Sequence, residues 1–197
     1  MPNTNDTKKS FYSGELIDDI FSKIKSILFD INNPDSQRLM KLLKYTDTEP
    51  YNRPDLTLED MIALLSSREK EEGDRRVFSL PITGDKEIKS NPQLRIFEGK
   101  AKKEAVNQNF LIRIPIKFVC VMSKDVAEFQ ASSTDLYPKN IRYRTIYIIC
   151  MKLLNGLYVG ASPMLTDKDK GYKPIAGAVE NGKDWVGAEW ELYTRSF

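Results

Sequence analysis

The most regular pattern in the chain is a strict alternation of apolar and polar positions over residues 109–122. The apolar side is formed by Phe110, Ile112, Ile114, Ile116, Phe118, Cys120 and Met122. This period of two predicts a β-strand with one buried face. At about 3.3 Å per residue the strand spans roughly 45 Å, whereas a compact chain of this length has a radius of gyration of about 16 Å. We therefore expect the strand to cross the whole domain or to project beyond it.

The other face of this strand carries Arg113, Pro115 and Lys117. Because proline has no backbone N–H to donate to a sheet, we expect the strand to bend, to bulge or to lie at a sheet edge at Pro115. The segment before the strand, residues 98–107 (EGKAKKEAVN), is strongly charged. We interpret it as the tip of a β-hairpin that reaches out of the body.

Helical spacing marks the first third of the chain. A first helix begins near residue 14 and ends before the Asn-Asn-Pro sequence of residues 32–34, and its apolar stripe is Leu16, Ile17, Ile20, Phe21, Ile24, Ile27 and Leu28. A second helix is predicted over residues 35–44. Thr57 opens a third, and Asp60 lies three residues later, as in a capping box.

The rest of the chain reads mainly as strands. Short strands are predicted over residues 77–82 and 93–97, and further strands over 157–165 and 184–195. Residues 141–154 suit a strand by propensity, but their length and the Asn-Gly sequence that follows favour a helix, which we predict. The predicted fold is therefore α+β, with N-terminal helices, a mixed or antiparallel sheet with a long projecting β-hairpin, and one helix packed across the sheet.

This pattern indicates one domain with a short appendage. Residues 1–10 form a polar arm that cannot pack by itself, and residues 11–197 form a single domain with a helical part over about 11–72 and a sheet part over about 76–197. In the last strand we expect Val186, Ala188, Trp190 and Leu192 to point inward and Glu189 and Glu191 to point outward.

Composition narrows the choice of partners. The chain has 197 residues with 30 basic and 28 acidic side chains, a formal net charge of +2. No strong field attracts nucleic acid or an anionic membrane, and neither a signal peptide nor an apolar run of membrane-spanning length is visible. Cys120 and Cys150 both lie in apolar runs, so we expect reduced core thiols, consistent with a cytosolic site of synthesis.

The sequence contains few of the residues and motifs that enzymes commonly use. The chain has no histidine, which removes the usual general base near neutral pH, the triads that depend on it and the commonest zinc ligand. It has no CxxC pair and neither of the glycine-rich phosphate-binding loops. We therefore expect a protein that is not an enzyme and that binds no cofactor and no metal.

Two carboxylate motifs nevertheless leave alternatives open. Asp55 after Pro54, together with Glu87 and Lys89, fits the PD-(D/E)xK pattern of metal-dependent nucleases. Asp55 precedes a helix and Glu87 lies in a turn, whereas that chemistry needs carboxylates converging from adjacent strands.

Residues 167–171 (DKDKG) hint at a cation loop, but calcium loops need more oxygen ligands, so a solvated turn is the simpler interpretation.

Basic and aromatic residues interleave at Arg142, Tyr143, Arg144 and Tyr147, a pattern that can clamp nucleic acid. The weak overall charge favours a different interpretation, in which the arginines occupy the solvated start of a helix. A nucleic-acid-binding accessory module stays open as an alternative. Trp185, at the start of the last strand, is a candidate interface anchor.

Two stretches resemble small structural proteins of tailed phages. Residues 42–50 (LLKYTDTEP), followed by residues 53–57 (RPDLT), resemble a segment found in proteins of phage neck gene clusters. The second half resembles the head-completion and tail-terminator group of neck, or head–tail connector, proteins, with a long hairpin, a helix ending in residues 153–156 (LLNG) and a Trp-rich last strand.

This resemblance implies a virion protein that is not an enzyme and that forms a homo-oligomeric ring, commonly of six or twelve copies, between portal and tail. The implied partners are other copies and other neck, portal or tail proteins, and non-specific contact with DNA in the channel is left open. We expect the 98–122 hairpin to contact neighbouring subunits, and deletion of residues 99–107 to leave a folded monomer. The candidate interface residues are Lys100, Lys102, Lys103, Phe110, Arg113, Pro115, Lys117 and Trp185.

Overall fold

The computed structural model describes residues 14–65, 75–81, 91–106, 109–130, 140–159, 162–166, 171–178 and 184–196. Within these ranges, residues 14–16, 103–106, 109–111, 178 and 196 are described by their backbone alone. The predicted arm at residues 1–10 and the loop at residues 167–170 lie outside the described residues. The described residues form four α-helices and a mixed sheet, so the fold is α+β, as the sequence predicts.

The three N-terminal helices lie where their apolar spacing predicts them: α1 (Gly14–Leu28), α2 (Pro34–Lys44) and α3 (Leu58–Leu65). Asn33 caps α2, because its side-chain oxygen accepts hydrogen bonds from the backbone N–H groups of Asp35 and Ser36 at 2.9 and 3.3 Å. A short 3-10 turn, η1 (Pro50–Asn52), follows α2.

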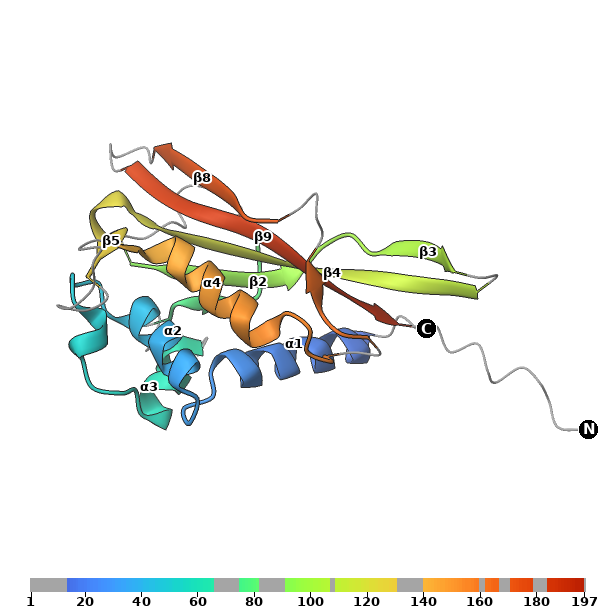
Figure 1. Ribbon diagram of the computed structural model, residues 1–197, viewed down its shortest axis with the longest axis horizontal. Coiled ribbons are helices and arrows are strands. Elements are labelled where there is room, and N and C mark those ends of the chain that lie inside the picture. Colours follow the sequence, from blue (N-terminus) through green and yellow to red (C-terminus); the bar gives the residue numbers. More distant parts are fainter. Residues whose placement is uncertain are drawn as a thin grey trace, which may run out of the picture.

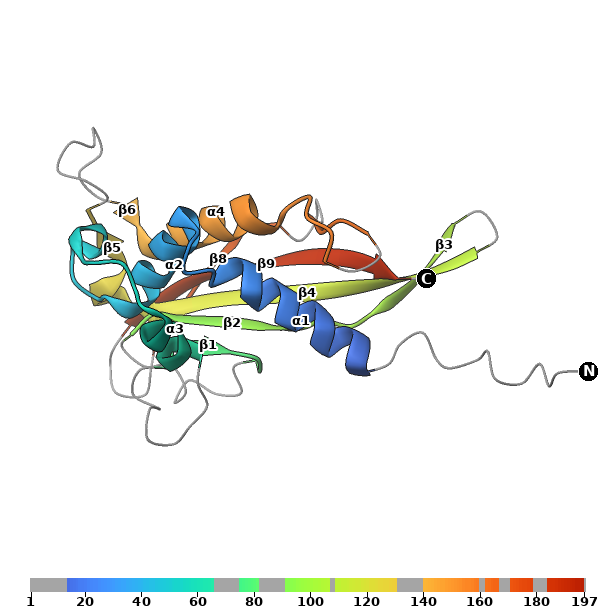
Figure 2. The same cartoon turned by 90° about the horizontal axis from the view of Figure 1, so that it is seen from below.

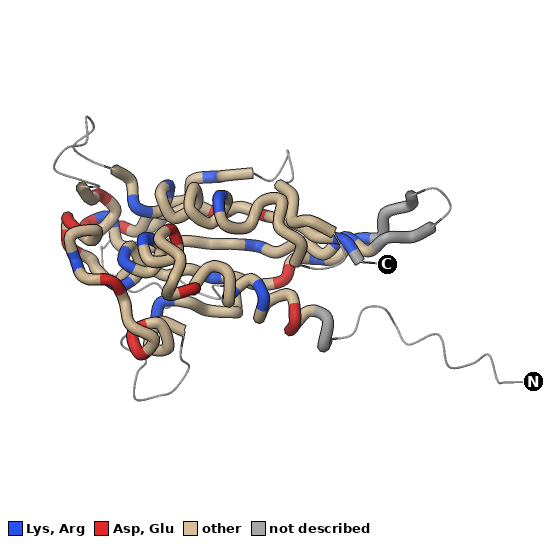
Figure 3. The backbone as a smooth tube through the Cα atoms, turned by 60° about the horizontal axis from the view of Figure 1, so that its bottom comes forward, with Lys and Arg blue, Asp and Glu red and all other residues tan. Residues whose placement is uncertain are grey.

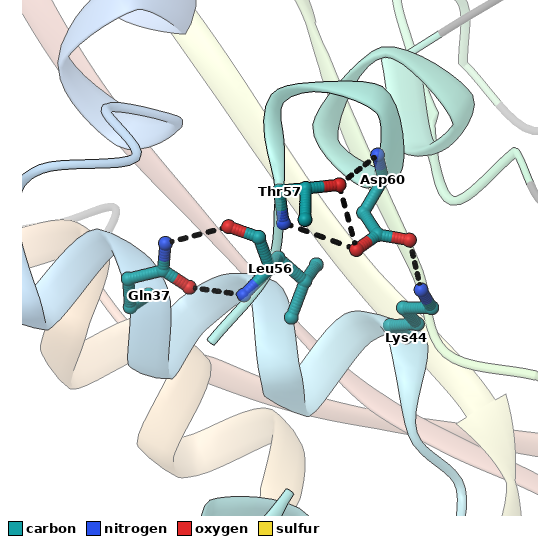
Figure 4. Close-up of polar contacts among 5 residues, drawn as sticks. All are labelled: Gln37, Lys44, Leu56, Thr57 and Asp60. Carbon is teal, nitrogen blue, oxygen red and sulfur yellow. Dashed lines mark hydrogen bonds and ion pairs between the residues drawn. The ribbon is translucent and has the colours of Figure 1, made fainter. Parts of the chain in front are cut away.

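The capping box of α3 is confirmed (Figure 4). The Asp60 carboxylate accepts hydrogen bonds from the backbone N–H and the hydroxyl of Thr57 at 3.0 and 3.1 Å, and the Asp60 N–H donates to the Thr57 hydroxyl at 3.2 Å. Lys44 pairs with the same carboxylate, and this contact, followed by the Thr57 hydrogen bonds, lowers the pKa of Asp60. The Gln37 amide bonds both backbone groups of Leu56, so α2 holds the segment that leads into α3.

The main sheet has seven strands among the described residues. They are β1 (Val77–Phe78), β2 (Gln93–Glu98), β3 (Lys102–Val106), β4 (Asn109–Ser123), β7 (Leu165–Thr166), β8 (Lys173–Ala178) and β9 (Asp184–Ser196). The order across the sheet is β1-β2-β4-β9-β7, with β3 also beside β4 and β8 also beside β9. Only the β1–β2 pair is parallel among these pairings. A separate small ladder joins β5 (Glu128–Phe129) to β6 (Asn140–Ile141), and a 3-10 turn, η4 (Lys124–Val126), follows β4.

The long strand predicted from the alternation is β4, and it forms the centre of the sheet. Its apolar side chains from Ile114 to Met122 at alternate positions are fully buried against the helices. The helix α4 (Arg142–Leu154) packs on β4 and β9, and α1 and α2 pack on α4. Figures 1 and 2 show these helices on one face of the sheet, and none of the described helices covers the other face.

Pro115 does not lie at a sheet edge, because β9 pairs with β4 on one side through the Pro115–Tyr193 position. On the other side the flanking strands are interrupted at this point, since β2 ends opposite Ile116 and β3 begins opposite Arg113. Gly99, in the interruption, donates its N–H to the Pro115 carbonyl at 2.8 Å. The sheet therefore accommodates the proline by a break in the neighbouring strands.

The charged segment 98–107 is not simply a tip. Its residues Lys102–Val106 form β3, which pairs antiparallel with the start of β4 from Lys102–Arg113 to Val106–Asn109. The connecting residues 107 and 108 lie outside the described residues. The charged side chains misled the interpretation, because β3 gains its structure from the cross-strand ladder rather than from propensity.

Three other expectations need correction, and one strand was missed. Of the strand predicted over 77–82, residue 82 lies outside the described residues, and only Val77–Phe78 of residues 77–81 form a strand. Within the stretch 157–165, residues 160 and 161 aside, only an isolated bridge and the start of β7 pair with other strands. The edge strand β8 was missed, because its sequence KPIAGA has low strand propensity. Glu191 does not point into open solvent, since only 4% of it is exposed.

Three further predictions in this half are confirmed. Residues 142–154 are the helix α4, which ends at Asn155, and Gly156 follows with a φ of +84°, a conformation that favours glycine. Cys120 and Cys150 are free, buried thiols, and burial raises the pKa of both. Ala188, Trp190 and Leu192 of β9 point into the core, and Val186 is partly buried there.

Candidate interaction surface

The end of the molecule formed by β3 and the start of β4 projects beyond the helices (Figures 1 and 2). The ladder between β4 and β9 stops at the Ile112–Ser196 pair, so Asn109–Leu111 extend past the last pairing position of β9. In this region β4 pairs only with β3 among the described residues. A ribbon of two strands has little stability of its own in water, so this end depends on the sheet behind it or on another surface.

Three basic residues line up across the base of this ribbon. Lys102 lies directly opposite Arg113, and Arg113 lies directly opposite Arg195, so β3, β4 and β9 contribute one cation each to a row. With adjacent strands about 4.8 Å apart, the row spans roughly 10 Å. We call these three residues the basic row.

Tyr193 lies at the centre of this arrangement. The Arg113 guanidinium carbon is 3.8 Å from the Tyr193 ring centroid, and that of Arg195 is 5.2 Å away. Both guanidinium groups are therefore held in place by cation–π contacts. At the end of β2, burial raises the pKa of the Glu98 carboxyl.

Seven of the eight candidate residues from the sequence lie at the ribbon or along β4. Lys100, Lys102 and Arg113 lie at the ribbon base, with Lys100 and Lys102 exposed and Arg113 half-buried. Lys103 and Phe110 lie on β3 and β4, where only the backbone is described, and Pro115 is buried beside Gly99. Lys117 is exposed on β4, directly opposite Glu191 of β9.

Trp185 is not part of the ribbon end. It pairs with Ser123, ten residues along β4 from Arg113, which places it roughly 33 Å away. A Cβ on Gly177 of β8 would approach the Trp185 ring to 2.7 Å, so the ring packs closely over that glycine. The structure thus separates Trp185 from the other candidate residues and gives it a packing role on the sheet.

A hollow of about 610 Å³ lies on the sheet face without helices. Its lining includes Phe97, Lys117, Val119, Lys173, Glu189 and Glu191. Lys173 pairs with Glu189 at 3.0 Å, and the two lysines balance the two glutamates. The hollow is therefore a neutral surface with mixed charges, unlike the basic row beside it.

Arg142 is buried, which overturns its placement at a solvated helix start. Its side chain is inaccessible to solvent and donates hydrogen bonds to the carbonyls of Leu42, Tyr45, Asp47 and Val126 at 2.8 to 3.0 Å. Burial lowers the pKa of Arg142 to about 10, and Asp47 and Tyr51 oppose that shift. The residue joins α4 to the segment after α2 and to η4, so its guanidinium cannot contact a nucleic acid.

The second arginine of that motif, Arg144, is exposed, as the sequence interpretation requires. Two residues apart on one helix, the arginines thus lie in opposite environments. Tyr147 packs against Trp190 with ring centroids 5.4 Å apart, so it belongs to the core between α4 and β9. The interleaved basic and aromatic residues are therefore divided between core and surface.

The carboxylate motif is only partly described. The exposed Asp55 carboxylate pairs at 2.7 Å with Lys41, a largely buried residue of α2, and Glu87 and Lys89 lie outside the described residues. No group of three or more Cys, Asp or Glu side chains in the described part of the chain is placed to hold a metal ion. Of the helices that the structure describes, none is long and apolar enough to cross a membrane.

Sequence reasoning missed two residues of the basic row region, Tyr193 and Arg195. Both sit at the end of a strand that the sequence predicted correctly, but nothing local links them to Lys102. The lengths of the strands now seen as β4 and β9 could have indicated this contact. Two long strands that pair antiparallel along most of their length bring the end of β9 beside the start of β4. Comparison of the chain with protein-family models, with curated proteins and with solved structures finds no match.

Proposed function

We propose that this chain is a structural protein of a phage virion, without enzymatic activity, that assembles through its β3–β4 ribbon into a ring at the head–tail joint. The resemblance of residues 42–50 and 53–57 to neck proteins supports a tail-terminator or head-completion role, with portal, tail or other neck proteins above and below the ring. The observation that carries the proposal is the ribbon itself, which extends past the end of β9.

The physical argument concerns unpaired strand edges. In the described residues, the outer edge of β3 and the β9 side of Asn109–Leu111 have no strand partner. Such edges readily accept a strand from another chain, and natural proteins protect them unless pairing is wanted. A contact between a projecting ribbon and a different surface of the next copy is heterologous, and heterologous contacts form a ring when the rotation from copy to copy closes.

The test is a shortened ribbon. Residues 104–111 are replaced by Asn-Gly, which joins Lys103 to Ile112 through a two-residue hairpin turn and keeps the Lys102–Arg113 position intact. This change is milder than deletion of residues 99–107, because that deletion removes all of β3 and leaves the start of β4 unpaired. Mass is then measured by light scattering, and the ring is imaged by negative-stain microscopy.

We expect the wild-type chain to have the mass of six or twelve copies and the shortened chain to be a folded monomer with an unchanged circular dichroism spectrum. A control variant, Arg144→Gln, changes an exposed charge on α4 and keeps the wild-type mass. If the shortened chain forms rings, the ribbon is not part of the interface. If the wild-type chain stays monomeric at high concentration, the proposed function is wrong.

A further inference from the structure

The strand β8 is an open edge of the sheet at the end of the body away from the ribbon. It pairs with β9 from Lys173–Glu189 to Ala178–Asp184, and no described strand pairs with its outer side. Its sequence, KPIAGA, has one charged residue, Lys173 at the start, and Ala176 is exposed. Proteins usually cover such an edge or place charged side chains along it, so a bare edge suits the addition of another strand.

The same side of the sheet is protected at its other end. The strand β7 pairs with β9 at Leu192 and Tyr193, and the Arg195 N–H donates a hydrogen bond to the Ser162 hydroxyl at 2.8 Å. A side chain there takes the place of a neighbouring strand. Among the described residues, this contrast marks β8 as the longest unprotected stretch on this side of the sheet.

The two sides of the ribbon that lack a strand partner differ in charge. The outer side belongs to β3, whose sequence KKEAV begins with three charged residues. The opposite side is formed by Asn109–Leu111 of β4, which have no charged residue. Figure 3 shows further basic residues where the ribbon leaves the body. Because charged residues on an edge discourage strand pairing, Asn109–Leu111 form the side of the ribbon that suits it.

These two uncharged edges lie too far apart to meet within one copy. The start of β8 is level with Val119 of β4, because both Lys173 and Val119 pair with Glu189, and Val119 lies roughly 30 Å along the strand from Asn109–Leu111. In Figure 1, β3 lies above β4 in the ribbon, so the unpaired side of the start of β4 faces down. The strand β8 lies above β9, so its outer edge faces up. A second copy displaced along the strands therefore brings the two edges together.

We propose that the outer edge of β8 in one copy accepts Asn109–Leu111 of the next copy, so that the next ribbon extends the sheet beyond β8. This inference rests on the proposed ring and names the surface that receives the ribbon. Each copy gives a strand at one end and accepts one at the other, which is a heterologous contact. Pro174 has no N–H to donate, so pairing falls on Ile175–Ala178.

The direction of the added strand follows from the topology. Both β4 and β8 are antiparallel to β9, so they run in the same direction within one copy. Neighbouring copies are rotated by about 60° in a ring of six and by about 30° in a ring of twelve. Strands related by so small a rotation stay closer to parallel than to antiparallel, so we expect parallel pairing between the copies.

Disulfide crosslinking tests the contact. Double variants combine one change in the ribbon with one change in β8: Asn109→Cys, Phe110→Cys or Leu111→Cys with Ile175→Cys, Ala176→Cys or Ala178→Cys. A disulfide needs Cα atoms within about 7 Å, so no bond can form inside one copy. After mild oxidation we expect covalent multimers up to the full ring on a non-reducing gel. The pairs that crosslink should share one difference in residue number, as parallel pairing requires.

Matched controls accompany these variants. Arg144→Cys, on the exposed surface of α4, replaces the β8 cysteine and should give no multimers, and the native thiols are buried. In the chain without added cysteines, Ala176→Lys places a charge on the β8 edge, and we expect copy-to-copy affinity to fall at least about tenfold in light scattering. Ala176→Ser should assemble like the wild type. Unfolding midpoints confirm that each variant is folded.

Two results would overturn this docking proposal while leaving the ring proposal standing. One is a ring of wild-type mass whose β8 cysteines form no crosslinks, and the other is wild-type affinity in Ala176→Lys. Crosslinks that share a sum of residue numbers, or that form only when Glu104→Cys of β3 replaces the β4 cysteine, also refute it, because they indicate antiparallel pairing or the other side of the ribbon. A monomeric wild-type chain instead refutes the proposed function on which the inference rests.

Discussion

The two ends of β4 use arginine in opposite ways. At the end near η4, Arg142 is fully buried and four main-chain carbonyls surround its guanidinium. At the other end, Arg113 and Arg195 remain partly exposed beside Tyr193 and lie directly opposite each other. The first end therefore buries its guanidinium among carbonyls, whereas the second holds its guanidinium groups against an aromatic ring at the partly exposed surface.

The residue type is the same at both ends. The difference between the two ends lies in the number of main-chain carbonyls available to accept hydrogen bonds from the guanidinium. Around Arg142, carbonyls at the end of α2, in the segment after it and in the η4 turn lack helix or sheet partners. One guanidinium group therefore donates hydrogen bonds to several of them. Around Arg113, the strands use their own carbonyls in the sheet ladder, and the guanidinium lies over the ring of Tyr193. We expect mutations at the two ends to affect stability very differently.

The largest effect is expected from Arg142→Met. Removal of the guanidinium leaves buried carbonyls without donors, and we expect a loss of about 3 to 5 kcal/mol in the free energy of unfolding. Urea titration followed by circular dichroism measures it. The matched variant Arg144→Met, two residues along the same helix and exposed, should change stability by less than about 0.5 kcal/mol. A loss below about 1 kcal/mol for Arg142→Met would contradict this account of the buried end.

A pH effect of intermediate size is expected from Tyr51, which packs edge to face on Phe129 with centroids 5.5 Å apart. Burial raises the pKa of Tyr51 from 10.0 to about 12. The neutral phenol is thus favoured by folding, so its contribution is complete below pH 10 and is lost as the pH rises toward 12. We expect a loss of roughly 2 kcal/mol, order of magnitude, over that interval.

The cysteine thiols also titrate at high pH, so the Tyr51 effect is read as a difference between two proteins. Urea titrations at pH 8 and pH 11.5 compare the wild type with Tyr51→Phe, which keeps the ring and removes the ionisable group. The wild type should lose more stability than the variant over this change. Equal losses in both proteins would show that Tyr51 does not titrate differently on folding.

A smaller effect is expected at the ribbon base from Gly99→Ala. An added Cβ would lie 3.0 Å from Pro115 Cγ, 3.2 Å from Pro115 Cβ and 3.3 Å from Lys117 Cε, so the rigid proline ring must shift. We expect a loss of about 1 kcal/mol. Hydrogen exchange should rise in β3 and stay unchanged around Arg142. Lys100→Ala, next to Gly99 and exposed, serves as the control and should match the wild type.

The smallest effect is expected from Lys102→Gln. Removal of the charge directly opposite Arg113 relieves repulsion, so stability should rise by a few tenths of a kcal/mol at 20 mM salt. At 500 mM salt, screening should abolish the difference. The measurement is the urea midpoint at both salt concentrations, at protein concentrations that keep the chain monomeric. A salt-independent loss of stability would show that Lys102 makes a contact that the basic row does not explain.

Much of the fold could be predicted from neighbouring residues. The alternation in β4, the helical stripe of α1 and the Thr57–Asp60 capping box all depend on side chains within a few positions of each other. The helix α4 needed one extra signal, the Asn155–Gly156 stop. By contrast, β8 was missed and the ribbon segment Lys102–Val106 was misread, because both strands gain their structure from the strand beside them.

The candidate site could be predicted only in part. Lys102 and Arg113 were named because they belong to the segment around the long strand, whereas Arg195 was missed and Trp185 was grouped with residues roughly 33 Å away. Arg142 was misjudged for a related reason. Its hydrogen-bond acceptors include the carbonyls of Leu42 and Asp47, about a hundred residues earlier in the chain. A local sequence pattern cannot predict these contacts, because only folding brings the groups together.

By itself, the sequence determined the class of fold, the central strand and the buried thiols, since hydrophobic periodicity and turn residues act over a single element. Only the tertiary structure decided which cations neighbour one another and which are buried. Strand register sets the basic row, because a shift of one residue would turn each side chain to the opposite face of the sheet. The environment of each charge is thus a property of the assembled sheet, and it is there that the surface proposed for assembly arises.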